Sequence, residues 1–206
     1  MDSAPLVHIL DDDESMRLAV SSLLRSVGLD VADYENVQAF LAADRPDIAG
    51  CLILDVRLPG VSGLDFQTQM MALGIELPVV LMTGHGDIPM SVQGMKAGAV
   101  DFLSKPFRDQ DMLDAVSAAI DRDRARRAQR AEMQETWARY DTLSPREREV
   151  MALVTDGLLN KQVAGELGIS EITVKIHRGA AMRKMGAQTL PELVRMADGL
   201  GLRRGV

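Results

Sequence analysis

Residues 7–14, VHILDDDE, place four largely apolar side chains directly before four carboxylates. The apolar half predicts a buried β-strand, and the acidic half begins where that strand ends. Carboxylates at this spacing repel one another, and nothing nearby in the sequence neutralises them. The crowding therefore lowers the stability of the fold unless a cation binds among these groups.

Short apolar runs alternate with helical patterns through the first 120 residues. Several runs are continuously apolar, which is typical of parallel strands covered by helices on both faces. This alternation predicts an α/β domain with a five-stranded, doubly wound parallel sheet, in which ligands bind beyond the carboxyl ends of the strands. The expected strands are 6–10, 29–34, 51–54, 79–82 and 100–103, and the expected helices are 15–27, 37–43, 63–73, 88–97 and 111–120.

Polar side chains follow four of the predicted strands. Asp11 and Asp12 end the first strand, Asp55 the third, Thr83 the fourth, and Lys105 follows the fifth. Because the carboxyl ends of parallel strands share one edge of the sheet, we expect these groups to converge there. Three carboxylates suit a hard divalent cation, Mg²⁺ or Mn²⁺, which keeps room for water and phosphate oxygens.

Composition and charge indicate two domains with different partners. The chain has 206 residues, 47% of them hydrophobic, and a net charge of −7. Residues 1–121 hold 7 Lys and Arg against 19 Asp and Glu, a net charge of −12, whereas residues 122–206 hold 16 against 11, a net charge of +5. One cysteine, Cys51, no charged-then-apolar leader and no apolar run of ~18 residues predict a cytoplasmic protein without a membrane segment.

The N-terminal half resembles the phosphoryl-accepting receiver domain of two-component response regulators. That resemblance implies a flavodoxin-like sheet with strand order 2-1-3-4-5. Each segment alone is a weak signal, but four in the same order, each at a predicted strand end, are specific. The segments are the acid pair at 11–12, LILDVRLPGVSGLD at 52–65, LMTGHGD at 81–87 and DFLSKPF at 101–107.

The resemblance also implies a role for each acidic residue. Asp55 would accept the phosphoryl group from a kinase phosphohistidine. Asp12, Asp55 and the backbone carbonyl of Arg57 would bind Mg²⁺ directly, and Asp11 would do so through water. Asp13 has no such role and is expected to start the first helix, where the helix dipole favours an acid.

Other positions would sense the phosphoryl group. By the same resemblance, Thr83 and Lys105 would bind its oxygens, and the bond between Lys105 and Pro106 would be cis. Phe102 would turn into the space that Thr83 vacates, changing the surface of residues 90–103 and favouring a homodimer. His85, like Arg57, stands where water attack on the phosphoryl group is modulated.

The C-terminal half begins with a helical linker. Residues 121–140 contain no Pro or Gly and many good helix formers, so the fifth helix is expected to continue as a solvated helix, with a weak coiled-coil seam as the alternative. Ser144, Pro145 and Glu147 form a capping-box pattern that starts the next helix. We therefore expect a receiver domain at 1–121, a linker at 122–141 and an all-α domain at 142–206.

A helix-turn-helix follows the linker. Helices at 161–167 and 171–185, joined by a glycine-containing turn, predict it, and a helix at 191–200 closes a four-helix bundle. Residues 142–200 also resemble the LuxR-type DNA-binding domain of the FixJ/NarL class of regulators.

The second helix of this motif carries the expected DNA contacts. Spacing places Val174, His177, Ala181 and Met185 toward the core and Lys175, Arg178, Gly179 and Met182 outward. The resemblance implies base contacts from Lys175, Ile176 and Gly179, although relatives often carry a longer polar side chain at the last position. The expected phosphate contacts are Arg178, Lys184, Lys161 and Thr173.

Together these features predict a transcription regulator that is switched by phosphorylation of Asp55. Its expected partners are a sensor histidine kinase, double-stranded promoter DNA and a second copy of the chain, with RNA polymerase as a further candidate. Its expected chemistry is limited to metal-assisted phosphoryl acceptance and self-dephosphorylation. The alternatives are a Mg²⁺-dependent phosphatase with Asp55 as nucleophile, and a receiver joined to a protein-binding module.

Overall fold

The protein is described by a computed structural model that covers residues 4–84 and 88–202. The chain divides into two compact units, residues 1–127 and residues 128–206, and the division falls inside the predicted linker. Within the described ranges, no helix combines the length and the apolar character needed to cross a bilayer.

The first unit contains the predicted sheet. All strands pair in parallel, in the order 2-1-3-4-5, which confirms the predicted topology. The strands are β1 (Leu6–Leu10), β2 (Asp30–Tyr34), β3 (Gly50–Asp55), β4 (Val79–Thr83) and β5 (Asp101–Ser104). The helices are α1 (Glu14–Ser26), α2 (Val37–Ala42), α3 (Gly63–Met70), α4 (Ile88–Lys96) and α5 (Asp109–Asp141).

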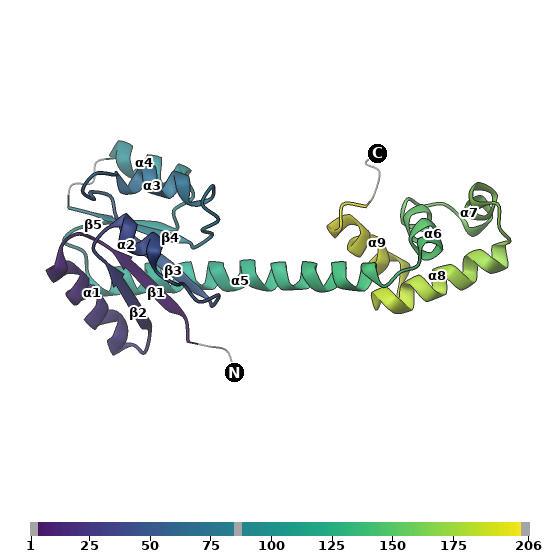
Figure 1. Ribbon diagram of the computed structural model, residues 1–206, viewed down its shortest axis with the longest axis horizontal. Coiled ribbons are helices and arrows are strands. Elements are labelled where there is room, and N and C mark those ends of the chain that lie inside the picture. Colours follow the sequence, from purple (N-terminus) through teal and green to yellow (C-terminus); the bar gives the residue numbers. More distant parts are fainter. Residues whose placement is uncertain (1–3, 85–87, 203–206) are drawn as a thin grey trace. The chain divides into compact units, whose positions relative to one another are not determined.

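Helices cover both faces of this sheet (Figure 1). Alternate strand residues such as Val7 and Ile53 pack with α1 and the first half of α5. Their neighbours in the strands, such as Leu52 and Leu54, pack with α2 and α3 on the opposite face. Burial on both faces explains why the strands read as continuous apolar runs.

The acidic loop leads directly into α1. Asp13 is the N-cap residue, and its carboxylate accepts hydrogen bonds from the backbone N–H groups of Ser15 at 2.9 Å and Met16 at 3.3 Å. These bonds satisfy donors that the first turn of a helix leaves without partners. The prediction that Asp13 starts the helix is confirmed.

Helix α5 is one continuous helix of 33 residues, as the sequence predicted, but residues 121–140, the segment expected to be solvated, are not solvated throughout. Asp123 is fully buried and accepts a hydrogen bond from the backbone N–H of Gly50 at 3.0 Å. Arg126 and Arg127 donate to the same carboxylate at 2.6 Å and 2.8 Å. The prediction of a solvated linker was wrong here because the start of β3 needs an acceptor that only the tertiary fold brings to it.

The second unit is a helical bundle around an apolar core. Fully buried Val150, Val163, Val174 and Leu193 bring one residue from each helix to this core. Ser144 and Glu147 make both hydrogen bonds of the predicted capping box. The helices are α6 (Pro145–Thr155), α7 (Asn160–Leu167), α8 (Glu171–Met185) and α9 (Leu190–Gly199).

The apolar part of the opening stretch contains one buried titratable group. The ring of His8 stacks on that of Tyr34 and packs edge to face against Phe40. Its Nδ1 shares a hydrogen bond of 3.1 Å with the hydroxyl of Tyr34. Burial, together with the positive charge of Arg45, lowers the pKa of His8 from 6.5 to about 4. The folded protein therefore holds a neutral imidazole at neutral pH.

We expect His8 to make the protein less stable in mild acid. His8 takes up a proton near pH 6.5 in the unfolded chain but only near pH 4 in the folded chain. The contribution of neutral His8 to the free energy of unfolding is therefore complete above pH 6.5 and is lost as the pH falls toward 4. At about pH 5 the loss is about 2 kcal/mol. Urea unfolding at about pH 7.5 and about pH 5 gives the drop in the free energy of unfolding between the two pH values. This drop should be about 2 kcal/mol smaller in His8→Gln than in the native chain. Identical losses in the two chains would contradict this prediction.

Candidate functional site

Three carboxylates converge at the carboxyl edge of the sheet. Asp11 follows β1 and is fully buried, Asp55 ends β3 and is buried, and Asp12 is exposed. One oxygen from each lies within 4.8 Å of the others. This donor set, closed on the side of the sheet and open toward solvent at Asp12, fits a hard divalent cation that keeps some of its water.

Lys105 supplies a positive charge to this cluster. Its ammonium donates to Asp11 at 2.6 Å and to Asp55 at 3.2 Å. Its backbone N–H donates to the carbonyl of Thr83 at 2.7 Å, and its bond to Pro106 is cis. Burial alone would lower the pKa of Lys105, but its hydrogen bond to Asp11 and the charges of both carboxylates raise that pKa above its ordinary value.

Asp55 is held less favourably as an anion than an exposed carboxylate. Burial raises its pKa, the charge of Lys105 opposes that shift, and the charge of Asp11 adds to it, so that the net direction is upward. The backbone N–H of Arg57 donates to its Oδ1 at 3.3 Å. A second cation beside Asp55 would therefore favour its charged, nucleophilic form.

Arg17 holds the backbone of the acidic loop, a role that the sequence did not predict. Its guanidinium donates to the backbone carbonyls of Asp11 at 2.8 Å and Asp12 at 3.1 Å, and to the carboxylate of Asp33 at 3.2 Å. A basic residue one turn into the helix after the acids was the available signal. These bonds reach the backbone of the loop rather than the carboxylates of Asp11 and Asp12, because the first turn of α1 brings position 17 back to the loop.

A glycine sets the close approach of α3 to the site. The backbone N–H of Gly63 donates to the carbonyl of Val56 at 2.9 Å. A Cβ at this position would lie 2.1 Å from the backbone carbonyl oxygen of Asp55, which no side chain can accommodate without displacing backbone. The loop between these points closes through an isolated antiparallel bridge between Arg57 and Ser62.

The structure places the predicted switch residues on adjacent strands. Thr83 ends β4 and is fully buried, and it stands beside Ser104 of β5 in the strand register. Phe102 stands beside Leu81 and is partly buried against the core that α2 and α3 cover. His85, the predicted modulator, lies outside the described residues.

Helix α8 presents a mixed apolar and basic surface. Lys175 is exposed, Ile176 is 63% exposed, and Ile172, which the sequence reasoning did not name, is 72% exposed one turn earlier. Ile172 and Ile176 lie four residues apart, so these two exposed aliphatic side chains are neighbours on one face of the helix, beside Lys175. We therefore treat the start of α8 as the candidate contact surface of the second unit.

The inner face of α8 is largely as predicted. Val174, Ala181 and Met185 are fully buried and His177 is half-buried. The prediction that Met182 points outward was wrong, because this side chain is partly buried and packs against the core. The bundle covers a wider stripe of the helix than the spacing of apolar residues indicated.

Two of the predicted phosphate contacts already have partners inside the unit. Arg178 donates to the side-chain oxygen of Asn160 at 3.3 Å. The ammonium of Lys184 bonds to the carboxylate of Glu147 at 2.6 Å and to the backbone carbonyl of Thr142 at 3.1 Å.

The remaining predicted contacts lie near the starts of the helices. Lys161 is exposed in the first turn of α7, and Gly179 is half-buried in α8. The hydroxyl of Thr173 shares a hydrogen bond of 2.8 Å with that of Ser170, the N-cap residue of α8.

We expect Arg17→Ala to weaken binding of Mn²⁺ to the acidic cluster by ~10-fold or more, because the carbonyls of the loop lose the donor that holds them. Electron paramagnetic resonance of free Mn²⁺ during titration measures the change. Arg25→Ala, also on α1, removes a donor to the carbonyl of Val31 and should leave Mn²⁺ affinity unchanged. An unaltered affinity in Arg17→Ala, with circular dichroism showing an intact fold, would contradict the role given to Arg17.

Comparison with known families divides the chain in the same way. Residues 7–117 match the model of the response regulator receiver domain, and residues 141–197 match that of bacterial regulatory proteins of the luxR family. Residues 118–140, between the two matches, belong to helix α5.

Relatives resemble this chain over nearly its whole length. It is 54% identical to Nodulation protein W of Bradyrhizobium diazoefficiens, over 96% of this chain and 87% of that protein. It is 45% identical to the transcriptional regulatory protein FixJ of Azorhizobium caulinodans, over 93% of this chain and 90% of the relative.

A solved structure shows the same similarity. The response regulator StyR superposes with a TM-score of 0.82 at 43% identity, covering 95% of this chain and 99% of that one.

Proposed function

This chain belongs to the two-component response regulators that join a receiver domain to a LuxR-type DNA-binding domain, and we propose that Asp55 is the residue through which it is switched. Proteins of this family regulate transcription. The phosphatase alternative leaves the second unit without a role, and the protein-binding alternative is disfavoured by the luxR-family match. The observation that carries the proposal is the convergence of Asp11, Asp12 and Asp55 around one position.

The proposed reaction is transfer of a phosphoryl group from a histidine kinase. A carboxylate oxygen of Asp55 attacks phosphorus, an O–P bond forms, and the P–N bond to the kinase histidine breaks with its electron pair remaining on the imidazole. Mg²⁺ or Mn²⁺, held by Asp11, Asp12, Asp55 and the carbonyl of Arg57, would neutralise charge on the transferred group. This chemistry makes the protein a phosphoryl acceptor rather than an enzyme that turns over external substrates.

Lys105 and Thr83 complete the receiving site. The ammonium of Lys105 is already 3.2 Å from Asp55, so a small movement away from Asp11 would let it bind a phosphoryl oxygen. Thr83 would offer its hydroxyl to another oxygen. Its displacement would admit Phe102, reshape the surface formed by α4 and β5, and favour the homodimer.

The second unit would then bind promoter DNA through α8. Lys175, Ile176 and Gly179 are proposed to meet base edges, and the exposure of Ile172 supports an apolar contact beside them. Arg178, Lys184, Lys161 and Thr173 are proposed to contact phosphates. Contacts from the first two require that they share or exchange their bonds to Asn160 and Glu147.

The cellular setting follows from the partners. Promoter DNA and the kinase phosphohistidine would meet the protein in the cytoplasm, where RNA polymerase is a further candidate partner.

We expect Asp55→Asn to abolish labelling by acetyl phosphate, since the amide cannot form the acyl phosphate. Phosphate-affinity electrophoresis of the full chain with Mg²⁺ measures the labelled fraction. Asp65→Asn, an exposed carboxylate in the first turn of α3, should be labelled like the native chain. Labelling of Asp55→Asn at the native level would reject Asp55 as the acceptor.

We expect Lys175→Ala to reduce binding to a preferred promoter sequence by ~10-fold or more, and binding to random DNA by much less, because a base contact carries sequence information. Fluorescence anisotropy against both DNAs, at two salt concentrations, measures each affinity. Arg195→Ala on the exposed side of α9 is the control and should change neither. Equal losses on both DNAs would show that Lys175 contacts only phosphate.

A further inference from the structure

A cavity of about 530 Å³ opens in the receiver unit at the end of the sheet opposite the acidic cluster. It lies where β4 begins, beside Pro78 and Val79, whereas Thr83 ends the same strand. None of the residues assigned above to phosphoryl transfer or to DNA lines it. Its volume is within the range of small-molecule sites, about 300–1,000 Å³.

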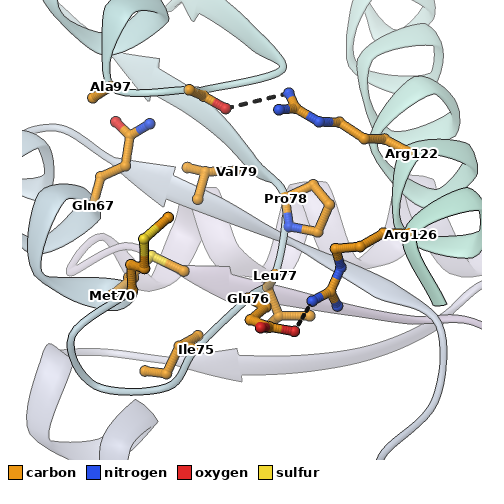
Figure 2. Close-up of a pocket in the computed structure, with 12 residues that line it drawn as sticks. Gln67, Met70, Ile75, Glu76, Leu77, Pro78, Val79, Ala97, Arg122 and Arg126 are labelled. Carbon is orange, nitrogen blue, oxygen red and sulfur yellow. Dashed lines mark hydrogen bonds and ion pairs between the residues drawn. The ribbon is translucent and has the colours of Figure 1, made fainter. Parts of the chain in front are cut away.

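The cavity has a largely apolar floor (Figure 2). Met70, Ile75, Pro78 and Val79 line it, and all of them are buried in the fold. Such a floor accepts an apolar body by removing its surface from water. The long, unbranched side chain of Met70 can adapt to the shape of that body.

Two arginines of α5 form one side of the cavity. Arg126 is already paired with the carboxylates of Glu76 and Asp123. Arg122 donates to the backbone carbonyl of Gly98 at 3.3 Å, and it forms no ion pair among residues 4–84 and 88–202. Its guanidinium therefore carries an uncompensated charge and donors that a carboxylate can engage in a two-point contact.

Gln67 forms the opposite side of the cavity in Figure 2. Its side-chain nitrogen donates to the carbonyl of Gly94 at 3.3 Å. Its side-chain oxygen is buried and has no hydrogen-bond partner in the described part of the chain. A buried acceptor without a donor destabilises the fold, so a ligand donor that reaches it stabilises the complex.

We propose that this cavity binds a small organic carboxylate with an apolar body and a hydroxyl group at its far end. The carboxylate bonds to Arg122, the body covers Met70 and Pro78, and the hydroxyl donates to Gln67. Arg122 is exposed and leaves the carbonyl of Gly98 to reach the carboxylate. The amide of Gln67 turns toward the cavity to meet the hydroxyl. A rigid body suits this arrangement because it loses little conformational freedom on binding.

Three probes separate the two polar contacts. 4-Hydroxybenzoate offers both groups, benzoate lacks the hydroxyl, and phenol lacks the carboxylate. Each is titrated into the full chain, labelled with ¹³C at its methionine methyls, and the shift of the Met70 methyl is followed. We expect saturable binding of 4-hydroxybenzoate and ~10-fold weaker binding of each of the other probes, the loss expected for one hydrogen bond to a charged or buried group.

Matched variants assign the contacts. Arg122→Gln should weaken the binding of 4-hydroxybenzoate and of benzoate by ~10-fold, because it removes the positive charge. The affinity for phenol should not change. Gln67→Met should weaken 4-hydroxybenzoate and phenol but not benzoate. Arg124→Gln, an exposed neighbour on α5 that does not line the cavity, should change none of them.

Two results would overturn the proposal. One is the absence of a saturable shift of Met70 up to about 10 mM probe, a limit that corresponds to binding weaker than about 3 kcal/mol. The other is equal binding of the three probes, which would show that only the apolar floor takes part. Acetyl phosphate labelling of Asp55 is measured separately and bears only on the receiver chemistry.

Discussion

The ammonium of Lys105, bonded to both Asp11 and Asp55, is the interaction on which the receiver edge depends. It joins the ends of three strands, β1, β3 and β5, that are far apart in the chain. Without a cation at this point the two buried carboxylates would repel each other in a medium that screens them poorly. In the proposed function, a divalent ion and a phosphoryl group would rearrange these charges at carboxylates that the fold already holds together.

Backbone contacts keep these charges in place. Arg17 holds the carbonyls of the acidic loop, and Gly63 lets α3 approach the end of β3 closely enough to bond its backbone. Neither the side chain of Arg17 nor the backbone of Gly63 needs to touch a reacting atom. Each instead holds the backbone next to Asp11 or Asp55, and the proposed phosphoryl transfer would need these carboxylates held to within a fraction of an ångström.

The opposite end of the receiver is organised by a third buried carboxylate, Asp123. The carboxylate of Asp123 accepts a hydrogen bond from the backbone N–H of Gly50, the first residue of β3, whereas Asp55 is the last residue of the same strand. Arg126 and Arg127 extend this contact to Glu76 and Asp47. Helix α5 is therefore held by ion pairs, up to residue 127, to the loops before β3 and β4. The proposed carboxylate site lies against the same helix.

Local sequence determined the main elements of this protein. Continuous apolar runs indicated parallel strands, the capping residues Asp13 and Ser144 marked helix starts, and the position of Asp55 after a strand indicated where the charges would meet. These features depend on neighbouring residues and on the shared edge of a parallel sheet, so a linear reading could find them. The tertiary structure alone decided the partners of Arg17 and Asp123, the burial of Met182 and the unpartnered oxygen of Gln67. Each depends on groups that packing brings together from separate elements, or on how far one helix sinks into its neighbours, and periodicity along one element carries no information about either.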